Sequence, residues 1–164
     1  MPDRPQNMYP GDRLADPSFD QNEILYCRVH PNWIQSDGKV DPGSVRCPDL
    51  SSSRSKYGLS YYVLYPRAVN GGHAVFRFGI DAVPQKISSG NPGGGTPTVY
   101  DVETVHDPCS DPGYENYAHC ETRVKRDGVR MKANKVSPGA IKSFQYQMSG
   151  ILKIERVAGQ PFPP

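Results

Sequence analysis

The sequence predicts a loop-rich α+β domain, with a mostly antiparallel sheet and one helix from the C-terminal half packed on it. The 164 residues include 17 prolines and 16 glycines, which are too many turn-forming residues for a helical bundle. They also include 10 tyrosines, 5 phenylalanines and 1 tryptophan, a composition too aromatic for a disordered chain. Several short segments with strand-like patterns and one segment with a helical pattern complete the prediction.

Segments of strand length recur along the chain and are separated by turn residues. Pro31 ends the first segment because proline removes a hydrogen-bond donor from the ladder, and Asp37-Gly38 then predicts a tight turn. Residues 41–58 are polar and rich in serine, proline and glycine, so we expect a loop over the surface. Residues 57–66 fit either a strand or a short buried segment. The predicted strands cover residues 23–29, 73–80, 98–105, 118–125 and 151–157.

Residues 118–125 show the clearest strand pattern, because small or apolar side chains alternate with charged ones. Asp127-Gly128 then predicts a hairpin turn. The face expected to point to the core carries Ala118, Cys120, Thr122 and Val124. The opposite face carries His119, Glu121, Arg123 and Lys125.

The pattern around residues 137–150 predicts the helix. Ser137 is placed to cap its N-terminus, and Pro138 suits the first turn. Gly150 is placed to end it. The face expected to pack on the sheet carries Ile141, Phe144 and Met148.

The composition divides the chain into an irregular N-terminal arm (residues 1–22), a single α+β domain (23–158) and a proline-rich tail (159–164). The first 20 residues hold no apolar run typical of a signal peptide. The longest apolar stretch, residues 61–65, is far shorter than the roughly 18 to 20 residues that cross a bilayer. We therefore expect a cytoplasmic protein that does not span a membrane. In that compartment the four cysteines are expected to be free thiols.

Three histidines occur beside residues that could assist chemistry. A sheet that gathered these segments would bring imidazoles, carboxylates and a guanidinium together, for acid–base catalysis or for binding a divalent metal. The sequence contains no established metal-ligand spacing, so no cofactor is evident. The alternative is structural, because a proline after His30 and after Asp107 indicates turns in which the side chain bonds nearby backbone. The candidate catalytic residues are Arg28, His30, His106, Asp107, His119 and Glu121.

A basic stretch surrounds the predicted turn at Asp127-Gly128. A basic β-hairpin can lie along phosphates, so this segment is a candidate nucleic-acid surface. The alternative is a solvated sheet edge whose charges prevent pairing with other chains. The candidate nucleic-acid-binding residues are Arg123, Lys125, Arg126, Arg130 and Lys132.

A longer pattern joins several of these segments. Arg28-Val29-His30-Pro31 is followed by Asp37-Gly38, and later by His106-Asp107-Pro108 and Asn116-Tyr117-Ala118-His119. This order resembles that of a set of small bacterial proteins, over roughly residues 24–125. Those proteins often carry a Leu-Ser-Val stretch where this chain has residues 50–54. The resemblance implies no particular activity. It implies an accessory component of a bacterial conflict system, and it favours Arg28, His30, His106, Asp107 and His119 as residues of interest.

Three functions follow as hypotheses. The first is a non-enzymatic binding or accessory protein with a protein partner, in a bacterial defence or toxin-type system. The second is an enzyme that uses histidines and carboxylates. It would be a metal- or histidine-dependent phosphodiester hydrolase, or a transferase resembling the ADP-ribosyl class with Arg28 or His30 opposite Glu121. The third is a nucleic-acid-binding module that uses the basic hairpin.

Overall fold

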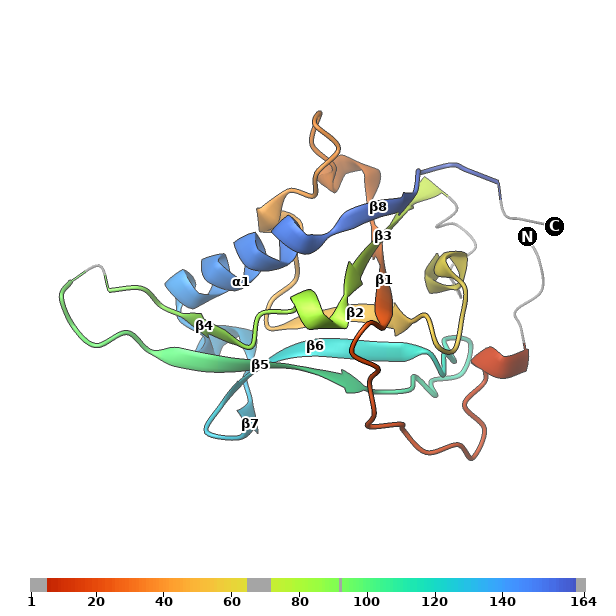
Figure 1. Ribbon diagram of the computed structural model, residues 1–164, viewed down its shortest axis with the longest axis horizontal. Coiled ribbons are helices and arrows are strands. Elements are labelled where there is room, and N and C mark those ends of the chain that lie inside the picture. The colour runs from red at the N-terminus through yellow and green to blue at the C-terminus, as the bar shows by residue number, and fades with distance from the viewer. Residues whose placement is uncertain (1–5, 65–71, 92, 162–164) are drawn as a thin grey trace.

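The computed structural model describes residues 6–64, 72–91 and 93–161. In this part of the chain, eight strands form one antiparallel sheet, and helix α1 (Pro138–Ile151) packs on it (Figure 1). The order of the strands is β4-β5-β6-β2-β1-β3-β8, and β7 pairs with the end of β6. The predicted α+β fold with one helix is confirmed. The strands are β1 (Ile24–Val29), β2 (Asp49–Arg54), β3 (Ala74–Gly79), β4 (Lys86–Ser88), β5 (Val99–His106), β6 (His119–Arg126), β7 (Val129–Arg130) and β8 (Lys153–Arg156).

Short 3₁₀ helices, labelled η, connect many of these strands. They are η1 (Gln6–Met8), η2 (Pro31–Trp33), η3 (Pro42–Ser44), η4 (Ser60–Leu64), η6 (Ile80–Ala82) and η7 (Ala133–Lys135). The predicted hairpin turn joins β6 to β7, where Asp127 and Gly128 both have positive φ angles of 52° and 78°. Two successive positive φ angles are typical of the turn that joins closely paired strands.

The hydrophobic core lies between α1 and one face of the sheet. Ser137 caps the helix by accepting a hydrogen bond from the backbone N–H of Ala140, as expected. Phe144 and Met148 are fully buried, and they belong to the same cluster as Leu25 and Phe76 of the sheet. Burial of one such side chain contributes about 1.5–3 kcal/mol, so this face holds the helix on the sheet.

Strand β2 corrects the prediction of a surface loop over residues 41–58. It lies between β1 and β6 in the middle of the sheet. Its buried polar side chains find partners far away in the sequence: Ser52 Oγ lies 3.1 Å from Cys120 Sγ, and Asn116 donates to Ser53 Oγ over 3.1 Å. Polar residues can occupy a central strand when each one is hydrogen-bonded. The strand was not predicted because these hydrogen-bond partners are distant in the sequence.

The structure also bears on the predictions for residues 57–66, for Gly150 and for the two ends of the chain. Residues 60–64 form the 3₁₀ helix η4, in which Leu64 is buried, so the predicted segment 57–66 is not a strand over its described part. Gly150 lies inside α1, which ends one residue later with Leu152 at its C-cap. Residues 65–66, 1–5 of the predicted arm and 162–164 of the predicted tail lie outside the described residues.

The segment before β1 is fixed to the sheet by a group of buried and half-buried polar side chains, which we call the arm clamp. Its members are Asp16, Glu23, Arg54, Tyr57 and His106. Arg54 is fully buried and donates to both carboxylate oxygens of Glu23 over 2.7 Å. It also donates to the backbone carbonyls of Asp16 and Ser18. Buried charges are tolerated when they are paired and hydrogen-bonded in this way.

Candidate functional site

A pocket opens where strands β1 and β2 separate. The two strands are paired with each other only at Leu25–Arg54 and Tyr26–Ser53, and Figure 1 shows β1 leaving β2 at a steep angle. The resulting cavity has a volume of about 440 Å³, and we call it the wedge pocket. Its polar lining includes Arg28, His30, Arg46, Ser51, His73 and His119. Three of the predicted candidates, Arg28 and His30 from one segment and His119 from another, therefore meet at one cavity.

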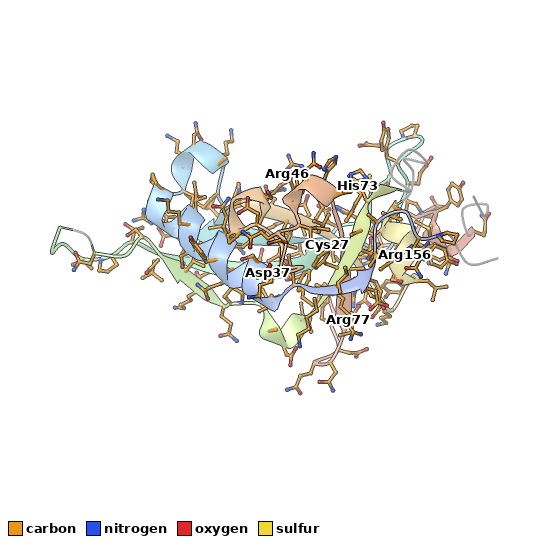
Figure 2. The ribbon with its side chains drawn as sticks, turned by 90° about the horizontal axis from the view of Figure 1, so that it is seen from above. Cys27, Asp37, Arg46, His73, Arg77 and Arg156 are labelled. Atoms are coloured by element: carbon orange, nitrogen blue, oxygen red, sulfur yellow. The ribbon has the colours of Figure 1, made fainter. Side chains whose placement is uncertain are left out.

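The wedge pocket has an apolar interior and an aromatic mouth. Cys27 and Val29 of β1 line the inner part together with Val40 and Leu152, which belong to the hydrophobic core. Trp33 and Tyr114 also line the pocket, and they are 40% and 47% exposed. Arg46 and His73 lie along the same side of the molecule in Figure 2, with Cys27 further inside. A cavity with apolar walls and a few polar groups is typical of small-ligand sites.

The wedge pocket is lined by basic side chains and by no acidic ones among the described residues. Among the described residues that line it are two arginines and three histidines, with no aspartate or glutamate. Arg46 is exposed and makes no ion pair within the described part of the chain. An arginine is charged at every physiological pH, and the pocket concentrates this positive charge in a partly enclosed space.

His30 is held in one orientation by the turn that follows β1. Its Nδ1 accepts a hydrogen bond from the backbone N–H of Asn32 over 3.1 Å, and it thereby caps η2. The structural alternative for His30, a side chain bonded to local backbone, is therefore present in the molecule. Because Nδ1 accepts, the proton of the neutral ring lies on Nε2, which can act as a donor. The ring of His73 packs edge-on against it with centroids 5.0 Å apart.

His119 at the start of β6 has the opposite arrangement. Its Nδ1 lies 2.6 Å from the backbone carbonyl oxygen of Asp107. A carbonyl oxygen can only accept, so Nδ1 carries the proton, and Nε2 of the neutral ring has a lone pair. The ladder between β5 and β6 brings these two segments together, since His106 pairs with Cys120 and the backbone N–H of Asp107 donates to the carbonyl of His119.

His106 lies away from the wedge pocket, in the arm clamp. Its Nδ1 accepts from the backbone N–H of Asp16 over 2.7 Å, and its Nε2 bonds the backbone carbonyl of Tyr117. Its ring stacks on Tyr57 with centroids 5.3 Å apart. Burial is the main cause that lowers the pKa of His106 below its usual value. Both ring nitrogens are hydrogen-bonded, one to Asp16 of the N-terminal segment, so His106 attaches that segment to the sheet.

The two carboxylates predicted as catalytic also lie outside the wedge pocket. Asp107 accepts from Arg123 over 2.7 Å, and Glu121 accepts from Arg123 and Arg130 over 3.1 and 3.0 Å. Glu121 lines a second hollow of about 690 Å³, which shares only Arg46 and Ser51 with the wedge pocket. The structure therefore groups Arg28, His30 and His119 around the wedge pocket, whereas His106, Asp107 and Glu121 do not line it.

The cations of the basic hairpin are mostly paired with carboxylates. Arg123 and Arg130 are bonded as described above, and Arg130 also contacts Asp49 over 3.0 Å. Lys125 bonds Glu103 over 3.0 Å, and Arg126 lies 3.7 Å from Asp127. Lys132 lines the second hollow and forms no ion pair among the described residues. The net positive charge of this surface is therefore smaller than its number of basic residues indicates.

Two residues of the wedge pocket were not identified from the sequence. His73 was assigned no role because it has no acidic neighbour in the sequence. The pairing of β1 with β3 matches Val29 with Ala74, which places the preceding His73 beside His30. Arg46 lies in a segment that was predicted to be a loop, and nothing in its sequence context distinguishes it.

The two buried cysteines are poor nucleophiles. All four lie in the described residues and are free thiols. Burial raises the pKa of the Cys27 and Cys120 thiols to about 12, so both stay protonated. No three histidine, cysteine, aspartate or glutamate side chains in the described part of the chain are grouped so that they could hold a metal ion. Nor does this part contain a helix that is long and apolar enough to cross a membrane.

Comparison of the chain with models of known families, with curated proteins and with solved structures gave no match. The wedge pocket is therefore interpreted from its own residues.

Proposed function

We propose that the chain binds a phosphate-bearing ligand in the wedge pocket. The observation that carries this proposal is the one-sided charge of the lining, in which arginines and histidines are present without a carboxylate. Arg46 forms no ion pair among the described residues, so its charge gains most from an anionic ligand. Arginine and histidine N–H groups are also suitable donors to phosphate oxygens.

The size and the mouth of the pocket favour a phosphate ester over a bare phosphate ion. A volume of about 440 Å³ falls in the range of pockets that hold small organic ligands. The half-exposed rings of Trp33 and Tyr114 offer flat faces to a ring on the ligand. The ligand would place its phosphate near Arg28 and Arg46, with its organic part toward the mouth.

Calorimetric titration with pyrophosphate tests the proposal. We expect Arg46→Glu to weaken binding at least about tenfold, because the substitution replaces an attraction with a repulsion. The matched control is Lys142→Glu, which makes the same change of charge on the exposed side of α1. Equal affinity in the two variants, or no binding by the wild-type chain, would contradict the proposal.

The proposal belongs to the class of binding proteins, which is the first of the three functions predicted from the sequence. It differs in the kind of ligand, which is a small anion in place of a protein partner. A role within a larger bacterial assembly stays a prediction.

A further inference from the structure

We infer that the phosphate-bearing ligand is an RNA strand and that the wedge pocket cleaves it, with His119 as the general base. This inference rests on the proposed phosphate-binding function and goes beyond it by naming a substrate class and a reaction. Three features support it: the hydrogen bond that fixes the His119 ring, the residue types in the pocket, and the second hollow beside it.

The first feature is the basic nitrogen of His119. The bond of 2.6 Å between Nδ1 and the carbonyl of Asp107 fixes the ring and leaves the lone pair on Nε2. The residue lines the wedge pocket and is half-buried. In His106, by contrast, both ring nitrogens are bonded within the protein. A positioned neutral imidazole with one nitrogen bonded to the backbone is the arrangement that a general base requires.

The second feature is the set of chemical groups that the pocket provides. None of its described lining residues is a carboxylate, the ligand type that holds Mg²⁺ in many phosphoryl-transfer sites. An RNA strand carries its own nucleophile, the 2′-hydroxyl group beside each phosphate. Its cleavage requires a proton acceptor and positive charge around the phosphorus, which His119, Arg28 and Arg46 would supply.

The reaction then balances as follows. His119 Nε2 takes the proton of the 2′-hydroxyl as the 2′-oxygen forms a bond to phosphorus. The bond between phosphorus and the 5′-oxygen of the next nucleotide breaks, and water at the mouth of the pocket protonates this oxygen. His119 returns its proton to the solvent. The products are a 2′,3′-cyclic phosphate and a free 5′-hydroxyl, and no oxidant or reductant takes part.

The third feature indicates a chain-like ligand. Arg46 and Ser51 line both the wedge pocket and the second hollow, so the two cavities are adjacent. The second hollow also contains Lys132, which could contact the next phosphate of a strand, and the carboxylates of Asp49 and Glu121 there are both paired with Arg130. Trp33 and Tyr114 are half-exposed at the mouth, and aromatic side chains in such positions stack on unpaired bases. A single-stranded RNA fits this arrangement better than a single nucleotide.

The test compares two single-stranded RNAs of the same sequence, one of them methylated at every 2′-oxygen. Binding of each is measured by fluorescence anisotropy, and products of the unmodified strand are identified by mass spectrometry in the presence of EDTA. The variant is His119→Asn, because the asparagine amide can still donate to the carbonyl of Asp107 while the basic nitrogen is lost. Lys142→Glu serves as the control outside the pocket.

We expect the wild-type chain to bind both strands and to cleave only the unmodified one, leaving 2′,3′-cyclic phosphate ends. His119→Asn is expected to bind the RNA and to cleave it at least about 100-fold more slowly. Binding without cleavage by the wild-type chain would overturn the inference and leave the phosphate-binding function intact. Absence of binding would overturn both. Cleavage that EDTA abolishes, or that persists at the wild-type rate in His119→Asn, would overturn the inference alone.

Discussion

The wedge pocket and the arm clamp both bring arginine and histidine side chains together, but they differ in what surrounds these cations. In the arm clamp, Arg54 is bonded to Glu23, and His106 uses both ring nitrogens within the protein. In the wedge pocket, Arg28, Arg46 and three histidines line a cavity that no carboxylate faces. The first region pairs its charges internally, whereas Arg46 in the second forms no ion pair among the described residues.

The comparison shows why residue type alone does not identify a functional site. Histidine and arginine stabilise a fold when their partners lie in the same chain, and they can bind an anion when those partners are missing. His106 at the end of β5 and His119 at the start of β6 are close together, yet the former belongs to the arm clamp and the latter lines the wedge pocket.

The largest expected effect is on stability, through the arm clamp. Arg54→Met removes the only cation among the described residues that bonds the buried Glu23 and leaves that carboxylate without its charged partner. We expect the free energy of unfolding to fall by about 3–5 kcal/mol, measured by urea denaturation. Arg46→Met, in the wedge pocket, is expected to change it by no more than about 0.5 kcal/mol. Similar losses in the two variants would remove the distinction between the regions.

A smaller effect is expected when the pH falls from about 7.5 to about 5. Burial lowers the pKa of His106, so the unfolded chain binds more protons below about pH 6.5 and the free energy of unfolding decreases. Asp16 adds to this only in stronger acid. Hydrogen bonds from Tyr57 and from the Ser18 backbone hold the pKa of its carboxyl well below the usual range. Its stabilisation is therefore lost only below about pH 4.

Urea denaturation at several pH values measures this decrease. His106→Gln is expected to be less stable at pH 7.5 and to show a flatter dependence on pH. An unchanged pH dependence in His106→Gln would contradict the role assigned to this residue.

The smallest expected effect comes from the basic hairpin. Lys125→Glu combined with Arg126→Glu reverses two charges whose carboxylate partners lie nearby. Because the hairpin lies outside the wedge pocket, we expect pyrophosphate affinity to change by no more than about twofold, as measured by calorimetric titration. A loss as large as that of Arg46→Glu would move the anion site to the hairpin.

The elements predicted correctly from the sequence are those whose pattern is local. Residues 118–125 alternate in the sequence, and Cys120, Thr122 and Val124 are buried in β6. The cap at Ser137 and the apolar face of α1 are likewise properties of neighbouring residues. Strand β2 was missed because its serines and Arg54 become acceptable in a sheet only through partners such as Glu23, Asn116 and Cys120.

The same reasoning applies to the candidate site. The unusual contexts of Arg28, His30 and His119 were visible in the sequence, and these three residues line one cavity. His106 has an equally unusual context, and only the position of Asp16 and Tyr117 explains it. His73 and Arg46 reach the pocket through strand pairing and through the path of a loop, neither of which a local pattern encodes.

The most direct test of the central claim is a titration of the ¹⁵N-labelled chain with pyrophosphate, followed by NMR. If the wedge pocket is the anion site, the largest shifts will occur at the backbone amides of residues 28–30, 46, 51–53, 73 and 119. Residues 123–130 of the hairpin will change little. Shifts that concentrate in the hairpin, or that are spread evenly over all surface cations, would contradict the claim.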